Sequence, residues 1–214
     1  MNSQMEKPLV IIGGGGHASV LVDVLLRQNR QILAIISPES VQERPVFSGI
    51  RHLKDDQDIS EFASDEVLLV NGIGVLPGSG VRRKVSEHFL SLGYRFETVI
   101  ADDAIVSPFA LVHEGAQVFS GAVVQTGAVV GTNSIINTNA VIEHDSVVGE
   151  YSHIAPNATL CGQVCCQQDV FVGAGATVVQ GLTLENQSIV GAGAALTQDL
   201  AAGKVCYSER SLIK

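Results

Sequence analysis

The apolar positions of the chain follow two different periods, and the change falls near residue 100. In the first part, short apolar runs alternate with stretches in which apolar residues recur at helical spacing. The sequence there predicts four strands and two helices, over residues 8–12, 32–36, 65–71 and 95–100 and over residues 17–28 and 79–92. Strands separated by helices favour a small parallel sheet, so we expect a Rossmann-like α/β domain over residues 1–100.

The second part follows a strict period of six. Every sixth residue from Val106 to Leu196 is aliphatic, with Cys166 as the one exception, and the residue four positions further on is small at nearly every step. This period indicates hexapeptide repeats, in which three hexapeptides form one triangular coil and both positions point inward. Glycines are expected to permit the corner turns, among them Gly121, Gly127, Gly173, Gly175, Gly191 and Gly193. A β-sandwich would alternate with period two instead. The sequence therefore predicts a parallel β-helix over residues 101–197, and a tail over residues 198–214 that folds back along the prism and caps it.

Composition narrows the classes of partner. The net charge of −9 disfavours nucleic acid as a ligand, because phosphate contacts need clustered Lys and Arg. The apolar run near the N-terminus is too short to span a membrane and lacks a signal-peptide pattern, so we expect a soluble cytoplasmic protein. The four cysteines show no paired CxxC spacing, which favours small buried side chains and predicts no metal site.

Three segments resemble one known family. They are the GGGGH segment at residues 13–17, INTNAVIEHDSVVG at residues 136–149 and EYSHI at residues 150–154. In register with the repeat, they resemble the bacterial hexapeptide-repeat sugar acyltransferases. These include the bacillosamine-pathway N-acetyltransferases, the perosamine N-acetyltransferase and the sialic acid O-acetyltransferases. The resemblance covers essentially the whole chain. It implies a left-handed β-helix, a homotrimer, and acetyl-CoA bound between neighbouring prisms.

The resemblance places catalysis at His144 and Asp145. His144 lies two residues after the inward Ile142, at a position expected to face outward. An amine that attacks a thioester must lose a proton, and an imidazole suits that transfer at neutral pH. The family often has Glu where Asp145 stands, and this acid raises the basicity of the imidazole. Asp is one methylene shorter, so Glu143 is an alternative supporting acid.

Further roles are implied only by the resemblance. His153 is expected to contact the thioester region of acetyl-CoA, where it would donate a hydrogen bond to the carbonyl oxygen. The backbones near Ala174 and Ala192 are expected to line the pantetheine groove, and Asn137 to face the sugar. The family commonly ends in Gly-Val-Pro-Ala-Lys, whereas this chain ends in VCYSERSLIK. Lys204 or Arg210 would then meet a CoA phosphate.

The glycine-rich segment after the first predicted strand is a candidate phosphate site. Backbone N–H groups at the start of a helix bind phosphate. A dinucleotide would also require an acidic residue after the second strand, where Ser37 and Pro38 stand, so we expect the diphosphate of a nucleotide sugar in preference to NAD. UDP-sugar members of the family often carry acids at these two positions, so dTDP and GDP stay open beside UDP. The expected substrate-binding residues are Gly13, Gly14, Gly15, Gly16 and His17.

The predicted function is acetyl-CoA-dependent N-acetylation of the C4 amine of a nucleotide-linked 4-amino-4,6-dideoxy sugar. UDP-4-amino-4,6-dideoxy-N-acetylglucosamine is the expected acceptor, and the amine attacks directly, without a covalent enzyme intermediate. O-acetylation of a sialic acid or related sugar is the alternative. A γ-class carbonic anhydrase would need three zinc-binding histidines, and the spacing of His113, His144 and His153 does not match. A repeat scaffold without activity would not need the glycine loop or the His-Asp pair.

Overall fold

The computed structural model describes residues 6–208. Its backbone contacts divide the chain into two compact units, Met1–Val99 and Ile100–Lys214. No helix among the described residues is long and apolar enough to cross a membrane.

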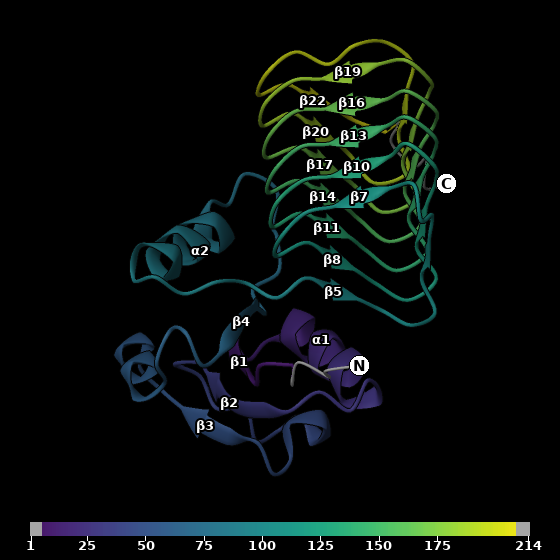
Figure 1. Ribbon diagram of the computed structural model, residues 1–214. Helices are drawn as coiled ribbons and strands as arrows, with labels where there is room; N and C mark the ends of the chain where they lie inside the picture. Colours follow the sequence, from purple (N-terminus) through teal and green to yellow (C-terminus); the bar gives the residue numbers. More distant parts are fainter. Residues whose placement is uncertain (1–5, 209–214) are drawn as a thin grey trace, which may run out of the picture. The chain divides into compact units, whose positions relative to one another are not determined.

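Unit 1 contains a four-stranded parallel sheet. Its strands and helices are β1 (Leu9–Ile12), α1 (Gly16–Arg27), β2 (Ile32–Ile36), β3 (Arg51–Leu53), β4 (Leu68–Asn71) and α2 (Val81–Ser91). The strand order is β3-β2-β1-β4 (Figure 1). The strand β1 is buried along its whole length. From β1 the chain continues to β2 on one side, while β4 pairs with β1 on the other. The carboxyl ends of β1 and β4 therefore form a topological switch point, where sheets of this type bind their ligands.

Several elements of unit 1 depart from the predicted ones. The sequence pattern missed β3 and two short 3₁₀ helices, Pro45–Phe47 and Asp56–Glu61. β3 contains one buried residue in three, so it carries no apolar run. The second 3₁₀ helix begins with a capping box between Asp55 and Asp58, a local signal that apolar spacing does not detect. Residues 95–100, predicted as one strand, form only a bridge from Phe96 to Leu69 and the short strand β5 (Val99–Ile100).

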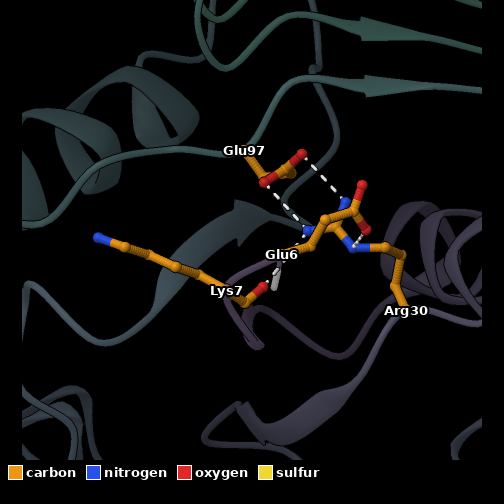
Figure 2. A network of polar contacts seen from close by, with 4 residues as sticks. All are labelled: Glu6, Lys7, Arg30 and Glu97. Carbon is orange, nitrogen blue, oxygen red and sulfur yellow. Dashed lines mark hydrogen bonds and ion pairs between the residues drawn. The ribbon is translucent and has the colours of Figure 1, made fainter. Parts of the chain in front are cut away.

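Arg30 ties three separate segments of unit 1 together (Figure 2). Its guanidinium donates to both carboxylate oxygens of Glu97, at 3.1 and 3.2 Å, and pairs with Glu6 at 3.0 Å. It also donates to the backbone oxygen of Lys7. Burial on its own would lower the pKa of Arg30, but the hydrogen bond and charge of Glu97 outweigh it and raise the pKa. The network joins the start of β1 to the α1–β2 turn and to residues 95–97.

Unit 2 is a left-handed parallel β-helix built from two-residue strands that stack coil upon coil (Figure 1). After β5 the strands are β6 (Ile105–Val106), β7 (Leu111–Val112), β8 (Gln117–Val118), β9 (Val123–Val124), β10 (Val129–Val130), β11 (Ile135–Ile136), β12 (Val141–Ile142), β13 (Val147–Val148), β14 (His153–Ile154), β15 (Thr159–Leu160), β16 (Cys165–Cys166), β17 (Phe171–Val172), β18 (Thr177–Val178), β19 (Thr183–Leu184), β20 (Ile189–Val190), β21 (Ala195–Leu196) and β22 (Val205–Cys206). They form three walls, in the orders β19-β16-β13-β10-β7, β21-β18-β15-β12-β9-β6 and β22-β20-β17-β14-β11-β8-β5.

The register repeats every eighteen residues, so that Val129 pairs with Val147 and Val130 with Val148. The predicted inward residues form one continuous aliphatic core in the centre of the prism. The hydroxyls of the inward Ser134, Ser146 and Ser152 donate to the next coil, and Ser146 Oγ meets the Cys161 oxygen at 3.0 Å. The hydroxyl of the inward Ser188 is buried without a hydrogen-bond partner among the described residues. The inward Cys166 is fully buried, and burial raises the pKa of its thiol. This cysteine therefore packs in the core as an unreactive thiol. The other three cysteines are partly exposed.

The corners follow the same period of six. Every sixth residue from Gly115 to Gly193 has a positive φ, and most of the non-glycine corner residues are Asn or Asp. Short polar side chains of this kind tolerate the left-handed backbone best. Gly173 and Gly191, expected at corner turns, lack a positive φ. An added Cβ on Gly173 would lie 2.5 Å from the Ala192 nitrogen, so this glycine instead allows two coils to approach closely.

The chain after Leu196 continues the winding, and the prediction that it folds back along the prism is wrong for the described residues to 208. Leu200 bridges to Leu184, and β22 pairs with β20. The offset is sixteen residues here instead of eighteen. The chain keeps winding because the preceding coil would otherwise leave its backbone donors and acceptors unpaired at an open edge. Lys204 lies exposed in this final turn, whereas Arg210 lies outside the described residues.

Candidate active site

His144 and Asp145 form a pair at one corner of the prism. They follow β12, and Asp145 is the corner residue itself, with φ +60°. His144 Nδ1 donates to Asp145 Oδ2 at 2.9 Å, and the two side chains are 54% and 60% exposed. A carboxylate can only accept, so the proton of the neutral imidazole lies on Nδ1. The lone pair on Nε2 is therefore left to accept a proton from a ligand.

The carboxylate that contacts the His144 imidazole belongs to Asp145 and not to Glu143. The Glu143 carboxylate lies 3.4 Å from the backbone nitrogen of His144, while the imidazole nitrogen is met by Asp145. The shorter side chain reaches because the left-handed corner turns it toward the preceding residue.

Two glycines on neighbouring coils make room for this pair. Gly162 lies one coil beyond His144, and an added Cβ there would sit 2.6 Å from Nε2 and 2.7 Å from Cε1 of the imidazole. Gly127 lies one coil before Asp145, and an added Cβ there would collide with Asp145 Oδ1. The sequence pattern predicted no role for Gly162, and it predicted Gly127 only as a residue of a corner turn. The eighteen-residue offset from each active-site residue is the signal that identifies both.

Asn137 and His153 form a second pair, on the seven-stranded wall. Thr138 N–H donates to Asn137 Oδ1 at 2.8 Å, which fixes the amide so that Nδ2 faces His153 Nε2 at 3.1 Å. His153 Nε2 therefore accepts, and the ring proton lies on Nδ1. The ring is 7% exposed and packs edge-on against Phe171. The Asn137 side chain, expected to face the sugar, is thus engaged with a neighbouring histidine and the following residue.

The remaining expected residues of the prism share this wall. Ala174 follows β17 and Ala192 follows β20, both exposed and one coil apart, and Gly193 N–H donates to the Ala174 oxygen. Asn137 and His153 belong to the same wall through β11 and β14. His144 follows β12 of the six-stranded wall. One prism therefore pairs His144 with Asp145 and Asn137 with His153, at different corners. The described residues include no group of three or more His, Cys, Asp or Glu that could hold a metal ion.

The glycine loop of unit 1 lies at the switch point. Gly13 has φ +97°, and Gly14 has no room for a side chain against Val41 and Ser37. Helix α1 begins after Gly15 with no side-chain cap and no acidic residue in its first turn. Its first N–H groups are therefore oriented toward any anion bound at the carboxyl end of β1.

A second glycine segment, residues 71–74, packs against this loop, and the sequence reasoning missed it. An added Cβ on Gly72 would lie 2.7 Å from Ala18 Cβ, and one on Gly74 would lie 3.4 Å from His17 Cβ. The overlooked signal was local: GIG at residues 72–74 directly follows a predicted strand, just as GGGG follows the first one. The loops after β1 and β4 thus form one surface.

Replacing Asp145 by asparagine should lower kcat about tenfold, because an amide can donate to Nδ1 and so favour the tautomer whose proton blocks Nε2. The loss is smaller than in a buried triad, since this pair is exposed to water. Glu143→Gln makes the same charge change beside the same histidine and should leave kcat nearly unchanged. Initial rates at saturating concentrations of both substrates test the pair. An equal loss in both variants would contradict the assignment of Asp145.

The stacked hexapeptides and the exposed imidazole–carboxylate pair at a corner define an acyltransferase of the hexapeptide-repeat class. The chain matches the PglD N-terminal domain over residues 8–89 and the bacterial transferase hexapeptide over residues 127–162. No curated protein sequence matches it.

Two solved structures are similar over nearly the whole chain. PerB, the perosamine N-acetyltransferase of Caulobacter crescentus in complex with CoA and GDP-perosamine, is 30% identical, with 94% of each chain covered and a TM-score of 0.85. The acetyltransferase domain of PglB from Neisseria gonorrhoeae, in complex with acetyl coenzyme A, is 26% identical, with 95% of this chain and 97% of that chain covered and a TM-score of 0.85. The chain belongs to the hexapeptide-repeat sugar N-acetyltransferases with a PglD N-terminal domain, as the sequence motifs predicted.

WeeI from Acinetobacter baumannii shares the fold, at 20% identity over 92% of this chain and 95% of that chain, with a TM-score of 0.81.

Proposed function

We propose that the chain transfers the acetyl group of acetyl-CoA to the C4 amine of a nucleotide-linked 4-amino-4,6-dideoxy sugar, with His144 as general base. The observation that carries the proposal is the 2.9 Å contact of His144 Nδ1 with Asp145, which leaves Nε2 as the accepting atom above Gly162. The similar structures support the chemistry, because they contain CoA or acetyl-CoA and, in one, GDP-perosamine.

The reaction needs one proton to be moved twice. As the amine bonds to the thioester carbonyl carbon, His144 Nε2 takes the proton that the nitrogen must lose. Asp145 stabilises the imidazolium that forms. When the C–S bond breaks, the imidazolium returns the proton to the leaving thiolate, and the histidine is neutral again. No bond forms between the protein and the acetyl group, so the acetyl group passes directly from CoA to the amine.

Acetyl-CoA is proposed to bind along the wall that carries His153, Ala174 and Ala192, beside the corner of a neighbouring copy. A homotrimer would bring the His144 corner of one prism to the His153 wall of the next, two features that a single chain carries at different corners. Exposed apolar residues on the outer walls support self-association, among them Leu111 and Val147. Because Nε2 of His153 accepts from Asn137, any donor role toward the thioester oxygen falls to the protonated Nδ1.

The nucleotide half of the substrate is proposed to bind at Gly13, Gly14, Gly15, Gly16 and His17. The uncapped start of α1 at the switch point supports a diphosphate there. UDP is the proposed carrier. GDP is the second candidate, favoured by the complex of PerB with GDP-perosamine. Nucleotide sugars and acetyl-CoA are cytoplasmic metabolites, so the proposed reaction belongs in the cytoplasm.

Release of free CoA thiol in the presence of a panel of acceptors tests this function. The panel contains UDP-, dTDP- and GDP-linked 4-amino-4,6-dideoxy sugars and a free sialic acid. Rapid thiol release with one nucleotide-linked amino sugar, and an amide in the product by mass spectrometry, is the expected result and names the base. Turnover with sialic acid alone would move the function to O-acetylation. An absence of thiol release with every acceptor would overturn the substrate class.

A further inference from the structure

A buried arginine holds the second glycine segment in place. Arg82, in the first turn of α2, is 3% exposed. Its Nη1 donates to the Asn71 oxygen at 2.8 Å and to the Ile73 oxygen at 2.7 Å. One nitrogen of the guanidinium thus bridges two carbonyl oxygens of the loop that follows β4. A buried cation is costly unless it is hydrogen-bonded, so its use on loop carbonyls indicates that the position of this loop matters.

Asn71 completes the network from the other side. This side chain is 1% exposed, and its Nδ2 donates to the Arg82 oxygen at 3.1 Å and to Ser86 Oγ at 2.9 Å. Its Oδ1 accepts from Ile73 N–H at 3.0 Å. Four hydrogen bonds therefore join residues 71–73 to the first turns of α2, and a fifth lies within the segment; together they determine the direction in which the chain leaves the sheet.

The segment fixed in this way supports the phosphate loop. Ile73 Cγ1 lies against Gly13, where an added Cβ would come within 3.0 Å. Gly72 fits against Ala18 in the first turn of α1, and Gly74 lies beside His17. Contacts thus run from Arg82 through residues 72–74 to three positions of the loop and helix start that face the switch point. A shift of the second loop would be transmitted to the first.

We infer that Arg82 and Asn71 are positioning residues for the nucleotide half of the substrate: they set residues 72–74, and through these the Gly13–His17 loop that receives the diphosphate. The inference rests on the proposed function. It makes the geometry of the phosphate site depend on a helix distant in sequence and on a side chain that itself need not touch the ligand. A purely structural network would instead affect stability alone.

Arg82→Met, which keeps the side-chain bulk and removes both carbonyl contacts, tests this inference in the full-length protein. We expect the KM for the nucleotide sugar, and the Kd for the matching nucleoside diphosphate measured by calorimetry, to rise about tenfold. The KM for acetyl-CoA should stay unchanged. Hydrogen exchange of the amides at residues 13–18 should speed up together with that at residues 72–74. Arg82→Lys should recover part of the affinity, because one ammonium nitrogen can meet the same two oxygens.

Arg83→Met is the matched control, since the neighbouring Arg83 pairs with Glu87 on the outside of α2 and should change none of these readouts. If Arg82→Met does not fold, Ser86→Ala removes one acceptor of Asn71 and should give a smaller change in the same direction. A folded Arg82→Met or Ser86→Ala with unchanged affinity and exchange would overturn the inference alone. Failure of the wild type to bind UDP, dTDP or GDP would overturn the proposed function, and with it the ligand assigned to this loop.

Discussion

Replacing His144 by alanine should lower kcat about 10²- to 10⁴-fold, the range that a positioned general base contributes. The change removes the proposed general base, whose Nδ1 contacts Asp145 Oδ2 at 2.9 Å. It leaves the wall that carries His153 and the glycine loop intact, so the KM values for both substrates should change little. Thiol release at saturating substrate measures the effect. Added imidazole should restore part of the rate, because the space vacated at this exposed corner admits a small base.

A second histidine of the prism provides the control. His113→Ala removes an imidazole from a different corner and should leave kcat within about twofold of the wild type, as expected for a surface change away from the reaction. Retention of more than a tenth of the wild-type kcat in His144→Ala would contradict the general-base role. The proton would then have to pass to solvent, and the corner pair would serve only to orient the substrate.

The prism could be predicted from the sequence because each hexapeptide repeats the same pattern of residue types. Every six residues the chain repeats an inward aliphatic residue such as Ile142, a corner residue three positions later and a small inward residue after it. A deviation in one hexapeptide therefore leaves the prediction for the other hexapeptides unchanged. The chain past Leu196 breaks this rule in sequence, yet it still winds, because unpaired backbone at the edge of the last coil determines its path. Pairing of that kind has no side-chain signature.

The candidate site was predictable in its residues but not in its contacts. His144 and its neighbouring acids were visible from the motif, whereas the choice of Asp145 over Glu143 depended on a left-handed corner that only the backbone shows. The Asn71–Arg82 network was missed for a different reason. It joins residues eleven apart across a loop, and buried polar partners of this type leave no periodic trace in the sequence.

Gly162→Ala should lower kcat about 100-fold, as expected when a catalytic group is displaced by about 1 Å. The added methyl would lie 2.6 Å from His144 Nε2, the atom that must accept the proton. Gly162 does not have a left-handed backbone, so alanine would not strain the backbone at this position. The imidazole is half exposed and can turn outward, away from Asp145, so stability should fall by less than about 1 kcal/mol. Initial rates and thermal unfolding of the same preparations measure both effects.

The double variant His144→Ala/Gly162→Ala separates displacement of the imidazole from damage to the coil. If Gly162 acts only by leaving room for the ring, the methyl has no further effect once the ring is gone, and the double variant should match His144→Ala in rate and in melting temperature. The two single losses would then be strongly non-additive, as expected for residues in contact. Additive losses would contradict this, because they would show that the methyl perturbs the coil or the bound substrate independently of the imidazole. The glycine one coil above the histidine would then belong to the fold and not to the active site.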